Sequence, residues 1–101
     1  MQTTKHIHVT GVVQGVGFRP FVYGLANRLA LHGWVCNTSA GVEIVAQGEE
    51  DRVRQFIESL STEAPPLARV EQVSTWDETA ESFTNFEIRE SERVEGAFQP
   101  I

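Results

Sequence analysis

The sequence predicts a domain of the α+β class, in which two helices cover one face of an antiparallel sheet. Apolar residues recur at helical spacing in two segments, residues 21–31 and 49–61, and five other segments have the apolar content and alternation of strands. The turn Ser39-Ala40-Gly41 between two of these strands is short enough to make an antiparallel hairpin. With 101 residues, the chain can bury a single core, so we expect one domain.

The predicted elements follow one another in the order βαββαβ, and a short fifth strand closes the domain. The expected strands are residues 5–13, 33–38, 42–47, 67–76 and 85–89. The apolar stripe of the first helix is formed by Val22, Leu25, Ala26 and Leu29. We expect Gly33 to end this helix in the left-handed conformation. Two helices on one face of an antiparallel sheet, in this order, make the ferredoxin-like arrangement.

The second helix should begin at three carboxylates, Glu49–Asp51, which favour the positive end of the helix dipole. Its apolar stripe is Val53, Phe56, Ile57 and Leu60. Imperfect alternation in the fourth strand indicates a bulge or an edge position. In the fifth strand, Phe86 and Ile88 should face inward. We interpret residues 1–90 as the domain and residues 91–101 as a C-terminal linker.

The composition argues against several classes of function. The formal net charge of −6 argues against non-specific nucleic-acid binding, which needs a cationic surface, and means that any anion site must be local. No apolar run approaches the roughly 20 residues of a membrane span, and the N-terminus lacks the apolar stretch of a secretion signal. A single cysteine, Cys36, excludes an internal disulfide and is typical of a reducing compartment. We therefore expect a cytoplasmic protein.

A glycine-rich loop, Gly11–Pro20, joins the first strand to the first helix. Gly15 and Gly17 permit positive φ and let a ligand approach the main chain. Such a loop turns several N–H groups toward one concavity, and the helix N-terminus adds positive potential. Arg19 supplies a planar fork of donors, and because it precedes Pro20 we expect it to close the loop and not to join the helix. The loop therefore predicts an anion site, most naturally for a phosphoryl group.

The glycines alone also allow a tight turn that binds nothing, since the loop lacks a Gly-Lys-Ser/Thr ending and the G-x-G-x-x-G spacing. Arg19 is the stronger signal, because a cation beside a helix N-terminus is unfavourable unless an anion binds there. Asn37, near the end of the second strand, either contacts a ligand or satisfies the turn beside Ser39.

Other residues with chemical potential favour structural roles. His6 and His8 share one strand face, but no carboxylate or cysteine is spaced along the chain to complete a metal site with them. Cys36 has neither a histidine partner nor a CxxC neighbour, and Trp34 and Trp76 are better explained by packing than by a substrate cage. The loop contains no serine, cysteine or aspartate that could form a covalent phosphoenzyme.

Two motifs in this chain resemble the signatures of the acylphosphatase family. The first is the loop sequence Val13–Arg19, and the second runs from Gly33 to Thr38 and continues across the hairpin to Gly48. The segment Phe86–Ile88 resembles the closing strand of the family. The resemblance extends over residues 5–89, and the two motifs occur in the expected order of elements.

This resemblance implies a role for several residues. Arg19 would bind the phosphoryl group, and Asn37 would orient the attacking water. The other phosphate-binding groups would be the main-chain N–H groups of Gln14, Gly15, Val16, Gly17 and Phe18. The resemblance also implies that neither a metal nor an organic cofactor is needed.

Pro20 after Arg19, and the chain beyond residue 89, resemble the N-terminal domain of the hydrogenase-maturation carbamoyltransferases. That branch uses carbamoyl phosphate to make the cyanide ligands of the nickel–iron centre. The resemblance implies a domain that binds and hydrolyses carbamoyl phosphate or another acyl phosphate and releases inorganic phosphate. Its partners would be downstream domains of the same chain and hydrogenase-maturation proteins, and the isolated domain would be a monomer. The alternatives are a non-catalytic binding module and a free-standing acylphosphatase.

Overall fold

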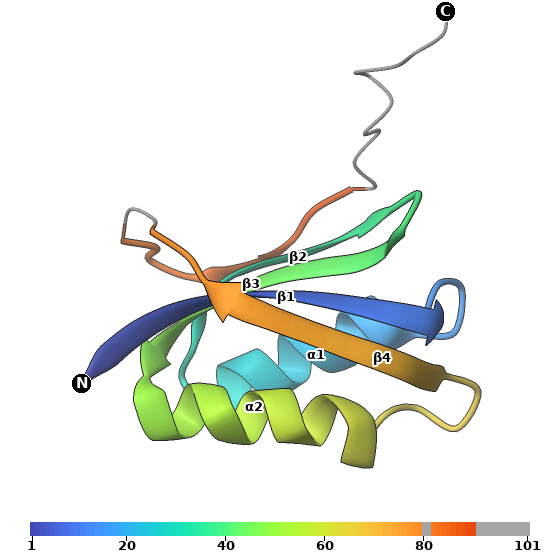
Figure 1. Cartoon of the computed structure of the whole chain (residues 1–101), viewed down its shortest axis with the longest axis horizontal. Helices are drawn as coiled ribbons and strands as arrows, with labels where there is room; N and C mark the ends of the chain where they lie inside the picture. The colour runs from blue at the N-terminus through green and yellow to red at the C-terminus, as the bar shows by residue number, and fades with distance from the viewer. Residues whose placement is uncertain (80–81, 91–101) are drawn as a thin grey trace, which may run out of the picture.

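The computed structural model describes residues 1–79 and 82–90, which form a five-stranded sheet and two helices (Figure 1). The elements in chain order are β1 (Gln2–Val12), α1 (Phe18–Arg28), β2 (His32–Thr38), β3 (Gly41–Glu49), α2 (Glu50–Thr62), β4 (Arg69–Asp77) and β5 (Phe86–Ile88). The predicted linker, residues 91–101, lies outside the described residues. Within the described part of the chain, neither helix is long and apolar enough to cross a membrane.

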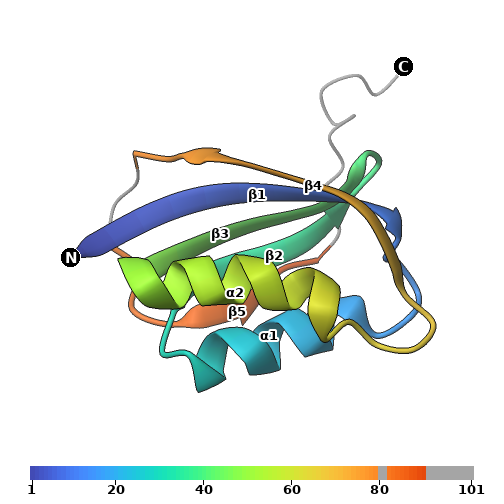
Figure 2. The same cartoon turned by 60° about the horizontal axis from the view of Figure 1, so that its bottom comes forward.

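The strands lie in the order β4-β1-β3-β2-β5, and both helices pack on the same face of the sheet (Figure 2). Neighbouring strands are antiparallel except for β2 and β5, which run parallel. The predicted ferredoxin-like α+β fold is confirmed, with a parallel edge strand added to the antiparallel sheet. The chain leaves β4 and enters β5 at the same end of the sheet, so β5 runs opposite to β4 and hence parallel to β2.

The core lies between the sheet and the two helices. The predicted stripe of α1 is buried, and α2 buries all of its predicted stripe except Ile57, which is partly buried. The sheet contributes Ile7, Val9, Val35, Val42 and Ile44. Each fully buried Val, Leu, Ile or Phe side chain contributes about 1.5–3 kcal/mol, so the two stripes are a main source of the free energy that holds the helices on the sheet.

Helix α1 begins before its apolar stripe does. Gly17 is the N-cap residue, with a φ of 80°, and the N–H of Phe21 donates to the carbonyl oxygen of Gly17 at 3.2 Å. Arg19 therefore belongs to the first turn of the helix, and the prediction that it closes the loop is wrong. Pro20 is tolerated in this turn because the N–H group that proline lacks would have no intrahelical acceptor at this position.

The predicted end of α1 is also wrong. Ala30, and not Gly33, adopts the left-handed conformation, with a φ of 59°. The N–H of Leu31 donates to the carbonyl oxygen of Ala26 at 2.8 Å, as in a Schellman motif. Gly33 lies within β2, where a β-carbon would stand 1.9 Å from the carbonyl oxygen of Val45. Glycine is therefore needed at this position for the close approach of β3.

Helix α2 starts after Glu49, which is the last residue of β3, so the first turn holds two of the three predicted carboxylates. The N-terminal amine of Met1 donates to Oε1 of Glu49 at 2.9 Å, and the Met1 carbonyl oxygen accepts the N–H of Glu50 at 2.9 Å. The hydrogen bond to Glu49, followed by the attraction of its charge, raises the pKa of the Met1 amine above its ordinary value of 8.0. The N-terminus thus helps to cap α2.

The two edge strands agree only in part with the prediction. β4 lies at an edge, and its register with β1 shifts between Thr10 and Gly11, so both features indicated by its imperfect alternation are present. In β5, Phe86 faces inward and is 4% exposed, but the same prediction for Ile88 is wrong, since it is 43% exposed. Ile88 lines a shallow pocket beside the first turn of α1, which leaves it open to solvent.

Candidate active site

The loop between β1 and α1 is held at its two ends and open in between. Val13 and Phe18 are 2% and 1% exposed and anchor the loop in the core. Gly15 and Gly17 have φ values of 75° and 80°, so both adopt the left-handed conformation that the sequence predicts to be accessible to them. A β-carbon on either glycine would meet no described atom within 4 Å. The main chain of this loop is therefore accessible to a ligand.

The N-terminus of α1 points positive potential at this loop. Among residues 1–79 and 82–90, no side chain caps Gly17, and the first turn of the helix contains no acidic residue. The main-chain N–H groups of the first turn have no intrahelical acceptors, and together with the helix dipole they favour a bound anion. The end of the helix is thus left without a carboxylate of its own to neutralise it.

Arg19 lies on this first turn and is partly exposed. Its Nη1 donates to the carbonyl oxygen of Arg89 at 3.1 Å. The N–H of Arg89 in turn donates to the carbonyl oxygen of Val35 on β2, at 2.8 Å. The guanidinium group is therefore oriented by the end of β5, and its remaining N–H donors can bind an anion.

Asn37 is the penultimate residue of β2 and is 9% exposed. Its Oδ1 atom is buried and has no hydrogen-bond partner among the described residues. An unpaired buried carbonyl oxygen costs about 1–3 kcal/mol, so an external donor would be favoured there. A water or a ligand with an N–H or O–H group fits this requirement.

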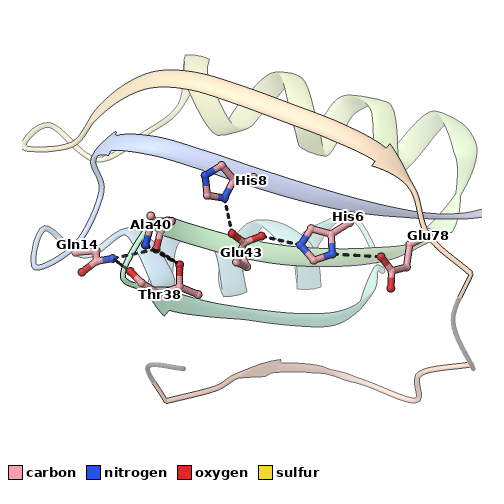
Figure 3. A network of polar contacts seen from close by, with 8 residues as sticks. His6, His8, Gln14, Thr38, Ala40, Glu43 and Glu78 are labelled. Atoms are coloured by element: carbon pink, nitrogen blue, oxygen red, sulfur yellow. Dashed lines mark hydrogen bonds and ion pairs between the residues drawn. The ribbon is translucent and has the colours of Figure 1, made fainter. Parts of the chain in front are cut away.

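Hydrogen bonds bring the loop and the end of β2 together. Nε2 of Gln14 donates to the carbonyl oxygen of Thr38 at 2.8 Å and to that of Gly41 at 2.9 Å (Figure 3). Arg19 reaches β2 from the other side, through the main chain of β5. The predicted site residues, which span residues 14–37, therefore gather at one end of the sheet, with Asn37 between these two connections.

The two histidines of β1 belong to a different region, on the face of the sheet opposite the helices, which we call the open face. Glu43 of β3 lies between them: its Oε1 is 2.6 Å from Nε2 of His6, and its Oε2 hydrogen-bonds Nδ1 of His8 (Figure 3). A carboxylate thus does accompany the histidines, from an adjacent strand. Even so, no group of three or more His, Cys, Asp or Glu side chains in residues 1–79 and 82–90 is arranged to hold a metal ion.

Comparison with known proteins identifies this combination of loop and strand. The family model described as acylphosphatase matches residues 5–88. The chain belongs to the acylphosphatase family. It is 46% identical over 91 residues to the carbamoyltransferase HypF of Synechocystis sp., a match that covers 90% of this chain and 12% of that protein.

Solved structures of acylphosphatase domains agree with this assignment. Full-length HypF in its phosphate- and nucleotide-bound form matches with a TM-score of 0.89 and 32% identity, over 92% of this chain and 12% of that one. An acylphosphatase from Coxiella burnetii matches with a TM-score of 0.82 and 42% identity, over 87% of this chain and 93% of that one. The chain thus spans nearly all of the Coxiella protein but only 12% of the length of HypF.

Two contacts of this acylphosphatase domain were not predicted from the sequence. Gln14 was expected to supply only its main-chain N–H, yet its side chain crosses to residues 24 and 27 positions away. Arg89, whose carbonyl oxygen orients Arg19, is 70 positions away from it. The sequence held one signal for the first contact. Gln14 is the only polar side chain between Gly11 and Phe18, and it directly precedes a glycine. Nothing along the chain identifies its partners.

Proposed function

We propose that this domain hydrolyses acyl phosphates. Arg19 and the main-chain N–H groups of residues 14–18 bind the phosphoryl group, and Asn37 holds the attacking water. The observation that carries the proposal is the buried Oδ1 of Asn37, which has no partner among the described residues and belongs to the end of β2 that Gln14 connects to the loop. An amide oxygen in this position can accept a hydrogen bond from water and fix the direction of its lone pair.

The chemistry of an acyl phosphate suits so sparse a site. The water oxygen attacks phosphorus, the bond between phosphorus and the acyl oxygen breaks, and the acyl group leaves as a carboxylate with the electron pair of that bond. Because a carboxylate is a stable leaving group, no general acid is required, and the proton from water passes to the phosphate or to solvent. Catalysis then depends on positioning and on stabilising the equatorial oxygens, which N–H groups and a guanidinium can do.

We further propose carbamoyl phosphate as the substrate, within a longer carbamoyltransferase that serves nickel–iron hydrogenase maturation. Support comes from the 46% identity to the Synechocystis carbamoyltransferase HypF, and from Pro20 directly after Arg19. Hydrolysis would release carbamate and inorganic phosphate, and downstream domains of the same chain would receive the carbamoyl unit. The alternatives are a binding module that holds the substrate without cleaving it, and a free-standing acylphosphatase.

Phosphate release by the 101-residue chain tests the proposal. The chain should release phosphate from acetyl phosphate and carbamoyl phosphate, and should leave a phosphate monoester intact, because an alkoxide is a much poorer leaving group. Binding of inorganic phosphate without hydrolysis of either acyl phosphate would favour the binding module. Equal turnover of the monoester would contradict the proposed chemistry.

A further inference from the structure

The side chain of Gln14 joins two segments that are far apart in the sequence. It donates to the carbonyl oxygens of Thr38 and Gly41, at 2.8 and 2.9 Å. A primary amide has two N–H donors, so these two bonds use both of them. Thr38 and Gly41 are paired residues that flank the turn between β2 and β3. Gln14 therefore fastens the tip of this hairpin to the loop (Figure 3).

The hydrogen bonds, and not burial, hold this side chain, because Gln14 is exposed. Gly15, which follows it, has open space where a side chain would be. On the hairpin, the hydroxyl of Thr38 serves the turn itself, since its Oγ1 accepts the N–H of Ala40 at 3.1 Å. The described contacts thus leave the two Gln14 bonds as the direct polar connection between the loop and the tip of the hairpin.

We propose that Gln14 is a positioning residue. Its side chain holds Asn37 at the distance and angle from the loop that hydrolysis requires. This inference rests on the proposed function and adds a role to the main-chain N–H of Gln14. Asn37 directly precedes Thr38, so a fixed Thr38 carbonyl group restrains the main chain that carries the Asn37 amide. The loop binds the phosphoryl group, and Asn37 on β2 binds the water. The two hydrogen bonds of the Gln14 side chain, which we call the clamp, fix the position of the loop relative to β2.

Attack of the water in line with the bond that breaks is sensitive to the position of the loop relative to β2. A misplacement of about 1 Å can cost about 100-fold in rate, even when each group remains intact. Without the clamp, the loop and Arg19 still bind phosphate, but the water held by Asn37 is no longer aligned with phosphorus. Turnover and phosphate affinity should therefore respond differently to its loss.

The test replaces Gln14 with methionine, which has similar length and no donor or charge. The matched control is Gln47→Met, since Gln47 also connects segments, to Thr4 at 3.1 Å and to Phe83 at 2.9 Å, at the far end of β3. We expect Gln14→Met to lower kcat for acetyl phosphate about 10- to 100-fold, with the Kd for inorganic phosphate by calorimetry changed less than about threefold. Gln47→Met should retain the parent kcat.

A double-mutant cycle distinguishes positioning from a merely structural role. If Gln14 acts through Asn37, adding Gln14→Met to Asn37→Ala should lower kcat less than about threefold further, because the group it positions is already gone. Far-ultraviolet circular dichroism and thermal unfolding verify that each variant is folded; should Gln14→Met not fold, Gln14→Glu, which keeps the shape and loses the donors, takes its place.

Two results would overturn the inference: parent-like kcat in the folded Gln14 variant, or a loss of kcat that is fully additive with Asn37→Ala. The parent chain is assayed first. A parent that cleaves no acyl phosphate contradicts the proposed function and the clamp together, whereas an active parent with an equally active Gln14 variant contradicts the clamp alone.

Discussion

The open face around the middle of β1 and the loop that follows β1 are polar regions that are built differently. On the open face, His6 lies flat against Trp76, with ring centroids 4.7 Å apart, and both oxygens of Glu43 contact histidines. Nδ1 of His6 is also 3.2 Å from Glu78. At the loop, Asn37 keeps a buried oxygen without a described partner, and the first turn of α1 contains no acidic residue.

This difference supports the proposal that the loop region, and not the open face, is the active site. A polar group that is hydrogen-bonded to protein atoms contributes to the stability of the fold and needs no ligand to satisfy it. A buried polar group without a hydrogen-bond partner lowers the stability of the fold. Its presence is most simply explained by a ligand or water that it binds. His6, the histidine whose two ring nitrogens both contact carboxylates, lies on the open face, whereas Arg19 and Asn37 lie at the loop.

The largest effect is expected from Arg19→Ala, which removes the cation beside the loop. Loss of a charge-assisted contact that strengthens in the transition state costs about 3 kcal/mol or more, so phosphate binding and turnover should both fall by more than about 100-fold. The free energy of unfolding should stay near that of the parent. Arg28→Ala, at the other end of α1, is the control, because Arg28 pairs with Glu63 on the surface. An Arg19→Ala chain that retains turnover within about threefold would remove Arg19 from the site.

Asn37→Ala sharpens the comparison by separating function from stability. Turnover of acetyl phosphate should fall about 10- to 100-fold, while the Kd for inorganic phosphate changes little. Because the substitution removes a buried oxygen that has no partner within the described part of the chain, the free energy of unfolding in urea should not decrease by more than about 0.5 kcal/mol. Equal losses of turnover and phosphate affinity would instead indicate a direct phosphate contact.

His6→Ala should show the opposite behaviour. The variant loses the stack on Trp76 and the contacts with Glu43 and Glu78, so its free energy of unfolding should drop by about 1–3 kcal/mol. Turnover at a temperature where the variant is folded should match the parent. His32→Ala, which loses one exposed contact to the carbonyl oxygen of Phe83, should destabilise less. Loss of turnover in folded His6→Ala would show that the two regions are coupled.

The smallest effect concerns the N-terminus, which is polar, paired and fully exposed. The folded-state pKa of the Met1 amine is raised by Glu49, so this contact stabilises the fold below the ordinary value of 8.0 and ceases to do so as pH rises through the raised pKa. Unfolding curves of the parent and Glu49→Gln should differ slightly at pH 7 and converge at alkaline pH. A difference that grows with pH would have the wrong sign for this contact.

Much of the molecule was predictable because its signals are local. Helical spacing in residues 22–29 and 53–60, and the short turn after Thr38, depend only on nearby residues, and the elements and their order were predicted correctly. The left-handed Gly15 and Gly17 were expected for the same reason. Predictions failed where local rules compete: Arg19 precedes a proline yet lies in the first turn of a helix, and Ala30 ends that helix although Gly33 was the better local candidate.

By itself, the sequence determined the elements, the glycine loop with Arg19, and Asn37 on the second strand, because each is a property of a few consecutive residues. Only the tertiary structure decided what these residues face. It brought Gln14 to the tip of the hairpin and oriented Arg19 on Arg89. It also left one oxygen of Asn37 unpaired among the described residues. Hydrogen bonds between segments depend on how whole layers pack, and no short stretch of sequence records that packing.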